Sequence, residues 1–490
     1  MNFLTKVEEK LNIAPYFFVV LTFVLMLFRV PFFDEAYAFL ISQLPTNEIF
    51  ELLKVEGHGA IWYLLLKIFS INSNFYPYPM LFLSWLISSV LIFVFWKKAP
   101  FNNLIKFLII FSYPFFNYFS IYARPYGLNV LILFLLASLV KDIVKKPILF
   151  SFLIVLCANI SAIGAIGAFA FFIFFLFEVK KIAKKDLFLS FFVYFLGAIF
   201  ILIQFSNVQM PELRPEFMIQ DFKNDLFNFI SFGIYSFNDR NIFQILFSVF
   251  SSVLLYFGGF LLFKKDKRVF LFLFINYALL TFLFIKIYVG AFWHYFFYFV
   301  YFIVALWLCW DKFKDNKTFK IFLIILLLIS LNSYSYSYFG RFDEIDTRTY
   351  KTMFKEINKE KYKKAKIFCL DWFCHFSPGL LPYLKKENID VYDVNGFKRD
   401  SKNSMMLTAR YRTQGFKGAE FIKHLDKNKD NYLITQHYIF SQGFYGTELN
   451  FVEDGFIYKD EKCKIFFEIK RFMPNIPFSI YKINLVEVYE

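Results

Sequence analysis

Apolar runs long enough to cross a lipid bilayer recur along the first two thirds of the chain. A membrane helix needs about 20 mainly apolar residues to span a hydrocarbon core of about 30 Å. The pattern therefore predicts a polytopic α-helical membrane protein with about eleven transmembrane helices. We expect the spans at 14–33, 79–96, 101–119, 125–140, 147–162, 164–178, 187–205, 242–263, 269–287, 291–310 and 318–338, the fifth and sixth being short and joined near Gly164.

The pattern changes beyond residue 338, where charged residues become frequent and apolar positions form only short segments. We expect strands at 366–373, 431–440, 464–470 and 477–486, and helices at 348–365 and 419–427. About 150 residues is an ordinary size for one domain. The sequence therefore predicts a transmembrane domain over residues 1–338 and a soluble α/β or α+β domain over 339–490.

The basic residues indicate which loops face the cytoplasm. Cytoplasmic loops of membrane proteins carry an excess of Lys and Arg. Here the basic clusters fall in every second loop, which places the N-terminus and these loops inside and places 34–78, 120–124, 206–241, 288–290 and everything after 338 outside. The first run is followed by FFDEAY rather than by a small-residue cleavage site, so we expect a retained anchor in the inner (cytoplasmic) membrane. The clusters are Lys97–Lys98, Lys141 with Lys145–Lys146, Lys180–Lys181 with Lys184–Lys185, Lys264–Lys265 with Lys267–Arg268, and Lys312, Lys314 and Lys317.

Composition agrees with this topology and excludes one class of partner. Of the 490 residues 58% are hydrophobic, and the mean hydropathy is +0.50. The net charge of +15 would suit a nucleic-acid partner, but the basic residues lie in short clusters between apolar runs, so we expect none. Cys369 and Cys374 lie in the outer domain, where a disulfide is permitted, but their spacing is weak evidence for a bond, and we expect buried free thiols.

Polar residues that could carry chemistry lie at the outer ends of the predicted spans. Asp34 and Glu35 follow the first run, Arg124 precedes the fourth span, and His294 begins the tenth. Charged groups at membrane depth are costly and usually functional. Since the topology places all of them on one side with His58, we expect them to line one cavity.

Each of these residues also has a structural interpretation. The two acids could cap the helix that follows them, or a carboxylate in a partly dry cleft could act as a general base. Arg124 could snorkel to the interface, or bind a phosphate with two parallel hydrogen bonds. His58 and His294 could be structural histidines. Glu56 with His58 could also hold a divalent metal, but two ligands do not define a site.

The first outer loop, 34–78, contains segments that predict amphipathic surface helices. FLISQL and NEIFELLKV carry apolar residues at helical spacing on either side of a break at Pro45–Thr46–Asn47. Such helices lie in the headgroup plane of a membrane. They would keep a lipid-borne substrate close to the acids.

Four segments in this order resemble the GT-C superfamily of membrane glycosyltransferases, which includes the protein O-mannosyltransferases and the lipid A aminoarabinose transferases. FFDEAYAF resembles the Asp–Glu signature of the first outer loop, and VEGHGAIWYLLLK, from Val55 to Lys67, resembles the acid-x-His-Pro-Pro-Leu segment. YARPYGLNVLILFLLASL and WHYFFYFVYFIVALW resemble the starts of two later spans in bacterial family 39-type members. The resemblance covers residues 15–338, and the C-terminal domain is similar in kind to the periplasmic domain of such proteins.

The resemblance implies transfer of a hexose or pentose from a polyprenyl-phosphate donor to an acceptor hydroxyl on a lipid, a glycan or a protein, with inversion. Asp34 would be the general base, and Glu35 would orient the acceptor or hold Asp34. Arg124, with His58, His294 and Lys67, would bind the donor phosphate. No cofactor is certain, and a divalent metal would involve Glu56.

The chain departs from the family pattern where the donor head would bind. His58–Gly59–Ala60 stands in place of His-Pro-Pro, Glu56 in place of the usual Asp, and Trp293 precedes His294 where Arg or His is common. These differences put the identity of the sugar in doubt.

Three other functions compete with this interpretation. A polysaccharide polymerase or ligase using diphosphate-linked glycans would be expected to carry a large outer loop rich in Arg and His, whereas the basic residues of 206–241 are Arg214, Lys223 and Arg240. A transporter would often show paired halves and broken central helices, and the sequence shows no internal repeat. A non-catalytic scaffold of the envelope would leave Asp34 and Arg124 dispensable.

Overall fold

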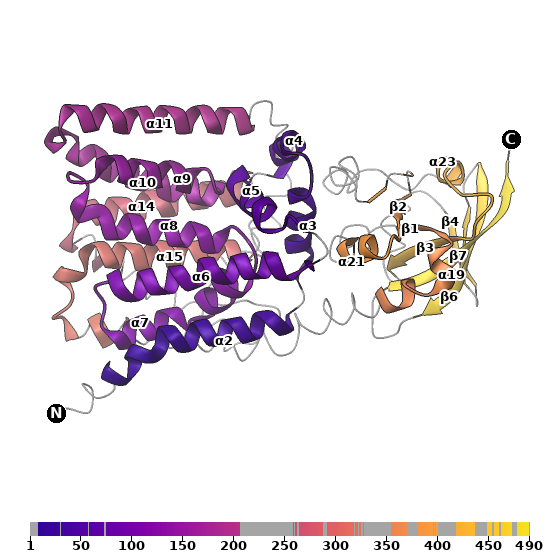
Figure 1. Ribbon diagram of the computed structural model, residues 1–490, viewed down its shortest axis with the longest axis horizontal. Coiled ribbons are helices and arrows are strands. Elements are labelled where there is room, and N and C mark those ends of the chain that lie inside the picture. Colours follow the sequence, from indigo (N-terminus) through magenta and orange to yellow (C-terminus); the bar gives the residue numbers. More distant parts are fainter. Residues whose placement is uncertain are drawn as a thin grey trace. The chain divides into compact units, whose positions relative to one another are not determined.

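The computed structural model describes residues 8–205, most of 258–327 and most of 354–489; the longer segments outside it are 1–7, 206–257, 328–353, 370–380, 400–417 and 437–447 (Figure 1). The chain divides into two compact units. The first, here the helical unit, comprises residues 1–29, 56–65 and 80–340. The second, here the sheet unit, comprises 30–55, 66–79 and 341–490, so that most of the first outer loop is grouped with the C-terminal residues.

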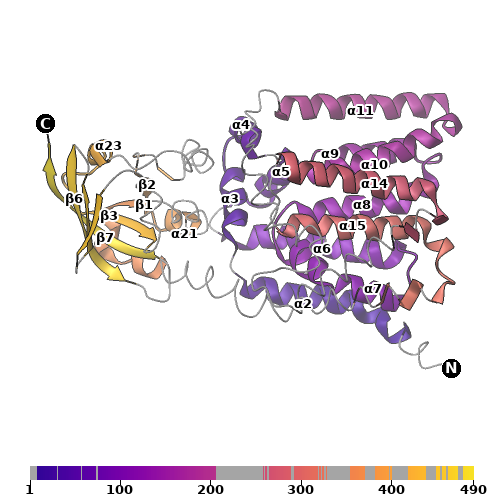
Figure 2. The same cartoon turned by 180° about the vertical axis from the view of Figure 1, so that it is seen from behind.

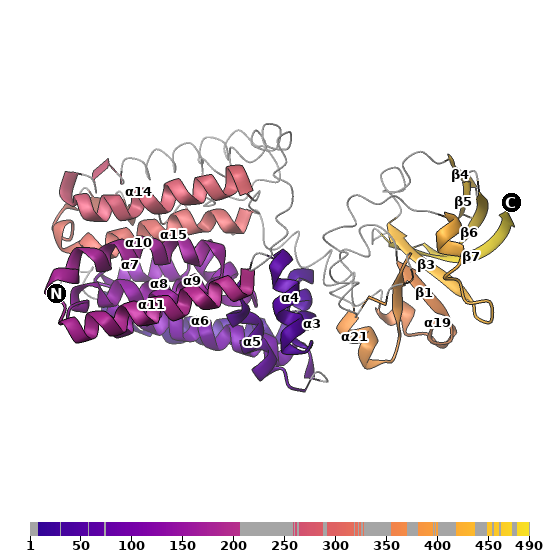
Figure 3. The ribbon, with the colours of Figure 1, turned by 90° about the horizontal axis from the view of Figure 1, so that it is seen from above.

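The helical unit is a bundle of apolar helices that pack side by side (Figures 1 and 2). Helix α9 packs against α8, α10 and α11, and α14 packs between α10 and α15. Figure 3 shows the α14–α15 pair from a second direction. The helices are α2 (Ala14–Phe28), α6 (Tyr78–Lys98), α7 (Asn103–Ile110), the π-helical η3 (Pro114–Ile121), α8 (Tyr126–Leu139), α9 (Pro147–Ala158), α10 (Ala162–Glu178), α11 (Lys184–Phe205), α14 (Lys267–Phe282), the π-helical η6 (Leu283–Ile287) and α15 (Phe292–Cys309), and α5 (Ala60–Phe69) begins in this unit.

Five helices among the described residues are long and apolar enough to cross a membrane, or six if a bent pair forms one span. This is consistent with the predicted helical membrane protein. It does not establish the number eleven. The predicted spans 242–263 and 318–338 lie largely outside the described residues, and the helices at the predicted spans 125–140, 147–162 and 269–287 are not among those that qualify. The fifth span is short, as the sequence predicts, because α9 is 12 residues long. The sixth is not short: with the turn that follows it, α10 forms a helix of 20 residues, Ala162–Lys181. Helix α9 joins α10 through residues 159–161, slightly before the predicted junction at Gly164.

The predicted span 101–119 is broken into two helices. Helix α7 ends at Ile110, η3 begins at Pro114, and the axes are bent by 57°. Proline has no N–H group to continue a helix, but it is well suited to the first position of a new one. Pro114 therefore accounts for the break.

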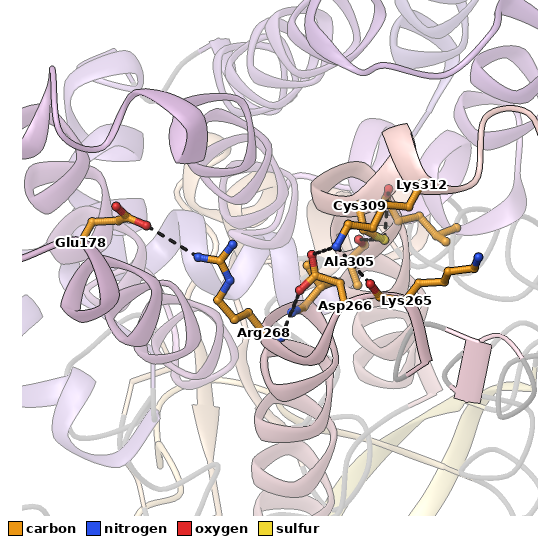
Figure 4. Close-up of polar contacts among 9 residues, drawn as sticks. Glu178, Lys265, Asp266, Arg268, Ala305, Cys309 and Lys312 are labelled. Carbon is orange, nitrogen blue, oxygen red and sulfur yellow. Dashed lines mark hydrogen bonds and ion pairs between the residues drawn. The ribbon is translucent and has the colours of Figure 1, made fainter.

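Ion pairs hold several basic loops of the helical unit together at one end of the bundle. Lys141, after α8, contacts Asp311 at 2.8 Å, directly after α15. Lys312 contacts Asp266 at 2.8 Å, at the start of α14. Figure 4 shows this contact together with that of Arg268 on Glu178, the last residue of α10, at 3.7 Å. Four predicted cytoplasmic loops thus share one end.

Two further contacts join the loop after α6 to this end. The rings of Phe101 and Trp310 are 4.8 Å apart between centroids, and Trp310 follows α15. The Asn103 N–H donates to a carboxylate oxygen of Glu8, ahead of α2, at 2.7 Å. The basic clusters of alternate loops therefore gather at one end of the helical unit, as the charge pattern along the sequence predicts.

The sheet unit contains two short helices of the first outer loop and a seven-stranded mixed sheet. The helices are α3 (Phe33–Ser42) and α4 (Thr46–Glu56), separated at Pro45 as expected. The sheet order is β2-β1-β3-β7-β6-β5-β4. Strands β2, β1 and β3 are parallel, and the other neighbours are antiparallel. The strands are β1 (Lys366–Cys369), β2 (Val391–Asp393), β3 (Asn431–Gln436), β4 (Glu448–Val452), β5 (Gly455–Lys459), β6 (Cys463–Phe472) and β7 (Phe478–Val488), with helices α19 (Glu360–Lys363), α21 (Leu381–Lys386) and α23 (Gly418–Ile422).

The C-terminal sheet confirms the predicted presence of a small domain with strands, with differences in detail. Strands β1, β3, β6 and β7 lie at the four predicted positions, whereas β2, β4 and β5 were not predicted. The predicted helix 348–365 is reduced to α19 and one turn at 354–357 within its described part. The core contains Phe368 on β1, Leu433 on β3 and Phe467 on β6.

Cys369 is disulfide-bonded, which corrects the expectation of a free thiol there. Cys157, Cys309 and Cys463 are buried free thiols. Since the chain has five cysteines, alkylation of the unreduced, denatured protein should label three, and reduction beforehand should raise the number to five. Intact-protein mass measures the count. Five labels without reduction would contradict the bond, and with it the oxidising compartment that such a bond requires.

Candidate functional site

The turn that carries Arg124 is fixed by contacts from two other helices. Arg29, at the end of α2, donates from Nη1 to the Ile121 carbonyl at 2.7 Å, and its Cζ lies 4.4 Å from the Tyr122 ring centroid. Ser84 of α6 donates to the Tyr122 carbonyl at 2.8 Å, and the Arg124 N–H donates to the same oxygen at 2.9 Å. The backbone around Arg124 is therefore held in place directly ahead of α8.

Tyr126, the first residue of α8, lies at the centre of the site. The Arg124 Cζ is 5.8 Å from its ring centroid, and the His58 ring stands edge-on at 6.2 Å. Its hydroxyl is hydrogen-bonded to His294 Nε2 at 2.6 Å. The structure thus brings together three predicted residues, Arg124, His58 and His294, around a tyrosine that comes from the start of a helix.

His58 and Arg124 are in direct but loose contact. Arg124 Nη2 lies 3.5 Å from His58 Nε2. Because guanidinium nitrogens only donate hydrogen bonds, Nε2 is the acceptor and Nδ1 carries the proton. Nδ1 is enclosed and has no hydrogen-bond partner among the described residues.

The environment of His58 keeps its ring neutral. Burial, and secondly the charge of Arg124, lower the pKa of His58 to about 3. The imidazole is therefore uncharged at neutral pH, so Arg124 supplies the positive charge of this pair. A bound anion would offset both effects and raise the pKa of His58, since an opposite charge favours the protonated ring.

This group of residues has the chemistry of an anion site. A guanidinium group provides a planar set of donors that matches a phosphate. The N-terminus of a helix, here that of the 14-residue α8, adds a dipole that favours negative charge. Arg124 is half-buried, so part of it meets solvent. We call Arg124, His58, Tyr126 and His294 the Arg124 cluster.

The Arg124 cluster lies at the end of the bundle opposite the basic loops. Arg124 precedes α8 and Tyr126 begins it, whereas the Lys141 ion pair follows it. His294 is near the start of α15, and Lys312 follows its end. The separation along each helix places the cluster at the end that the charge pattern predicts to be outside.

The two predicted acids lie in the sheet unit, in the first turn of α3. Glu35 is fully buried, and its Oε2 accepts a hydrogen bond from the Phe32 N–H at 2.6 Å. It therefore caps its own helix, which is the structural role that the sequence left open. Asp34 is half-buried. A carboxylate at this position is also stabilised by the helix dipole.

The described contacts give Lys67 a structural role and assign no role to Glu56. The Lys67 Nζ donates to the Leu44 carbonyl, which ties α5 to the end of α3. Glu56 is the last residue of α4, and its side chain lies outside the described part. No group of three or more His, Cys, Asp or Glu side chains suited to a metal occurs among the described residues.

Sequence reasoning assigned no role to Tyr126, Arg29 or Gln204. Tyr126 belongs to the segment YARPYGLN, whose resemblance to a family motif was a usable signal, but its ring carries no charge that would mark it. Arg29 ends the first apolar run, where a basic residue is unremarkable. Gln204 is the one polar residue of the run AIFILIQF at the end of α11, which was a usable signal.

Comparison with models of known protein families and with curated proteins finds no match to this chain.

Proposed function

We propose that the protein is an integral membrane glycosyltransferase that moves a sugar from a polyprenyl-phosphate donor to an acceptor hydroxyl at the outer face of the membrane. The observation that carries the proposal is the Arg124 cluster. It combines a half-buried guanidinium, two histidines and a helix N-terminus at the end of an apolar bundle, opposite the basic loops. A lipid phosphate needs such a cationic site at membrane depth.

In this proposal the Arg124 cluster binds the phosphate and stabilises it as a leaving group. Arg124 donates two hydrogen bonds to phosphate oxygens, and Nδ1 of His58 is a further donor. Tyr126 positions His294 through the bond between their side chains. Groups that are already oriented toward developing negative charge usually make the largest single contribution to catalysis.

Asp34 is the proposed general base. It takes the proton of the acceptor hydroxyl as that oxygen attacks the anomeric carbon. The bond from the anomeric carbon to the phosphate oxygen breaks, and the electron pair leaves with the polyprenyl phosphate. One displacement inverts the anomeric configuration. Glu35 holds the start of α3, and therefore Asp34, through its bond to the Phe32 N–H.

The full topology is also part of the proposal. Eleven spans with the N-terminus in the cytoplasm would place the Arg124 cluster, the first outer loop and residues 339–490 outside. The grouping of basic loops at one end supports this orientation. The disulfide at Cys369 supports an oxidising compartment for the C-terminal residues.

The test is transfer by the purified protein from a panel of polyprenyl-phosphate sugars, followed by mass spectrometry of the lipid product. We expect at least one donor to yield free polyprenyl phosphate and a glycosylated acceptor. The same panel should include diphosphate-linked oligosaccharides, which a polymerase or ligase would use instead. Turnover of those donors alone would reject the monophosphate proposal, and no turnover by a protein that also fails to bind undecaprenyl phosphate would favour a scaffold.

A further inference from the structure

The loop that carries His58 is tied by its backbone to two other elements of the helical unit. His58 forms an antiparallel bridge with Ser161, in the turn between α9 and α10. The Gly59 N–H donates to the Ile160 carbonyl at 3.1 Å. The Ala60 N–H donates to the side-chain oxygen of Gln204, near the end of α11, at 2.7 Å. Backbone contacts with other elements thus hold three consecutive residues, His58, Gly59 and Ala60.

Gln204 uses both ends of its amide in this arrangement. While Oε1 accepts from Ala60, Nε2 donates to Asn159 Oδ1 at 2.8 Å. Asn159 in turn donates from Nδ2 to the Val155 carbonyl of α9 at 2.8 Å. The side chains of Gln204 and Asn159 are buried, with exposures of 0% and 2%. Removing either amide would leave a buried polar partner without its hydrogen bond, which is unfavourable.

Only glycine fits at position 59, because the backbone of the turn between α9 and α10 lies close to its Cα. A Cβ at this position would lie 1.8 Å from the Asn159 carbonyl oxygen and 2.5 Å from its carbon. Both atoms belong to the backbone, so neither can move aside easily. The N–H groups of Gly59 and Ala60 are both used, so a proline at either position would remove a hydrogen bond.

His58 needs these external bonds because its sequence neighbours do little to fix the backbone. It stands between Gly57 and Gly59 in the sequence, and glycine restricts the chain least. Its contact with Arg124 is long, at 3.5 Å, so a small displacement of the loop would separate the two side chains. A binding constellation works only when its members are held close to the productive geometry.

We propose that Gln204 is a positioning residue that holds the His58 loop against Arg124, so that the donor phosphate meets a preformed pair of side chains. The proposal rests on the proposed function for the phosphate, but the hydrogen-bonded arrangement itself does not. It links the end of α11 to the Arg124 cluster through Ala60. A displacement of that end of α11 would therefore reach His58.

The test compares Gln204→Met, which keeps the length of the side chain but neither hydrogen bond, with the wild type. Two quantities are measured on the full-length protein in detergent: the affinity for undecaprenyl phosphate beside undecaprenol, and amide hydrogen exchange in the peptide that contains Ala60. We expect the affinity for the phosphate to fall about tenfold, that for undecaprenol to stay unchanged, and the Ala60 amide to exchange faster. Ser190→Ala, at a second fully buried polar residue of α11, is the matched control and should change neither quantity.

Gln204→Glu serves as the second variant if the methionine variant does not fold. Its carboxyl oxygen can still accept from Ala60, so we expect slow exchange of that amide and an affinity closer to that of the wild type.

Faster exchange in Gln204→Met with unchanged phosphate affinity would overturn the positioning role, and unchanged exchange would overturn the hydrogen-bonded arrangement itself. If Arg124→Ala also leaves the phosphate affinity unchanged, the proposed function fails together with the positioning role; if only Arg124→Ala weakens binding, the positioning role alone fails.

Discussion

Arg124→Ala should weaken binding of undecaprenyl phosphate by about 10- to 100-fold and leave binding of undecaprenol unchanged. Hydrogen bonds to charged groups contribute about 1.5–3 kcal/mol each, and this variant removes the charge of the cluster together with its fork of donors. Arg124→Lys keeps the charge but not the fork, so we expect an intermediate affinity. Equilibrium binding of the two lipids to the purified protein measures the difference.

Arg268→Gln is the matched control for this experiment. It also removes one arginine charge from the helical unit, but at the basic end of the bundle, where Arg268 is exposed and contacts Glu178 (Figure 4). Exposed ion pairs contribute about 0–1 kcal/mol, so we expect neither binding nor stability to change appreciably. An affinity of the Arg124→Ala protein for undecaprenyl phosphate as high as that of the wild type would remove Arg124 as the phosphate ligand.

The membrane class could be predicted from sequence because it depends on a single local quantity. A run of apolar residues forms a helix in a bilayer whatever its neighbours are, since the backbone must satisfy its own hydrogen bonds there. The charges in the loops then predicted which helix ends lie on the same side, and the ion pairs of Lys141 and Lys312 join such ends. The proline at position 114 was also a signal for the bend, which the prediction of a single span over 101–119 does not include.

Strand β2 was missed because its formation depends on a partner that is distant in the sequence. Strand β2 is three residues long and is stabilised by parallel pairing with β1, for example Ile367 with Val391. Strand preference follows packing against neighbours more than local propensity. Strand β4 pairs with β5, and β5 pairs with β6, both across short connections. The sequence ELNFVEDGFIYK carries an Asp-Gly pair between two short strand-like segments, which was a usable hairpin signal.

Within the Arg124 cluster, sequence reasoning identified the residues whose side chains are charged or can become charged. Arg124, His58 and His294 stand out in apolar surroundings, and the structure places them together. The supporting residues do not stand out in this way. Gln204 is 144 positions away from Ala60, and a hydrogen bond over that separation leaves no local pattern. Gly59 appeared in the sequence only as a departure from His-Pro-Pro, whereas the structure gives it a physical reason: a side chain there would collide with the backbone at Asn159.

Asp34→Asn should abolish sugar transfer while the protein still inserts in the membrane and binds undecaprenyl phosphate. A general base typically contributes about 100- to 10,000-fold to the rate, and the asparagine amide cannot accept the proton of the acceptor hydroxyl. The substitution changes the size of the side chain very little. Transfer rate and lipid binding, measured on the same preparation, separate the loss of the base from the loss of the site.

Glu35→Gln is the matched control, because it neutralises the neighbouring carboxylate in the same turn of α3. The glutamine side-chain oxygen can still accept the Phe32 N–H that Glu35 Oε2 accepts at 2.6 Å, so the helix cap is retained. Glu35 would affect catalysis only by holding Asp34 in position, and the retained helix cap keeps that position. We therefore expect the transfer rate to fall less than about tenfold. Full activity of Asp34→Asn would remove Asp34 as the base. A collapse of activity in Glu35→Gln alone would assign the base to Glu35, because its carboxylate would then be needed for more than the cap.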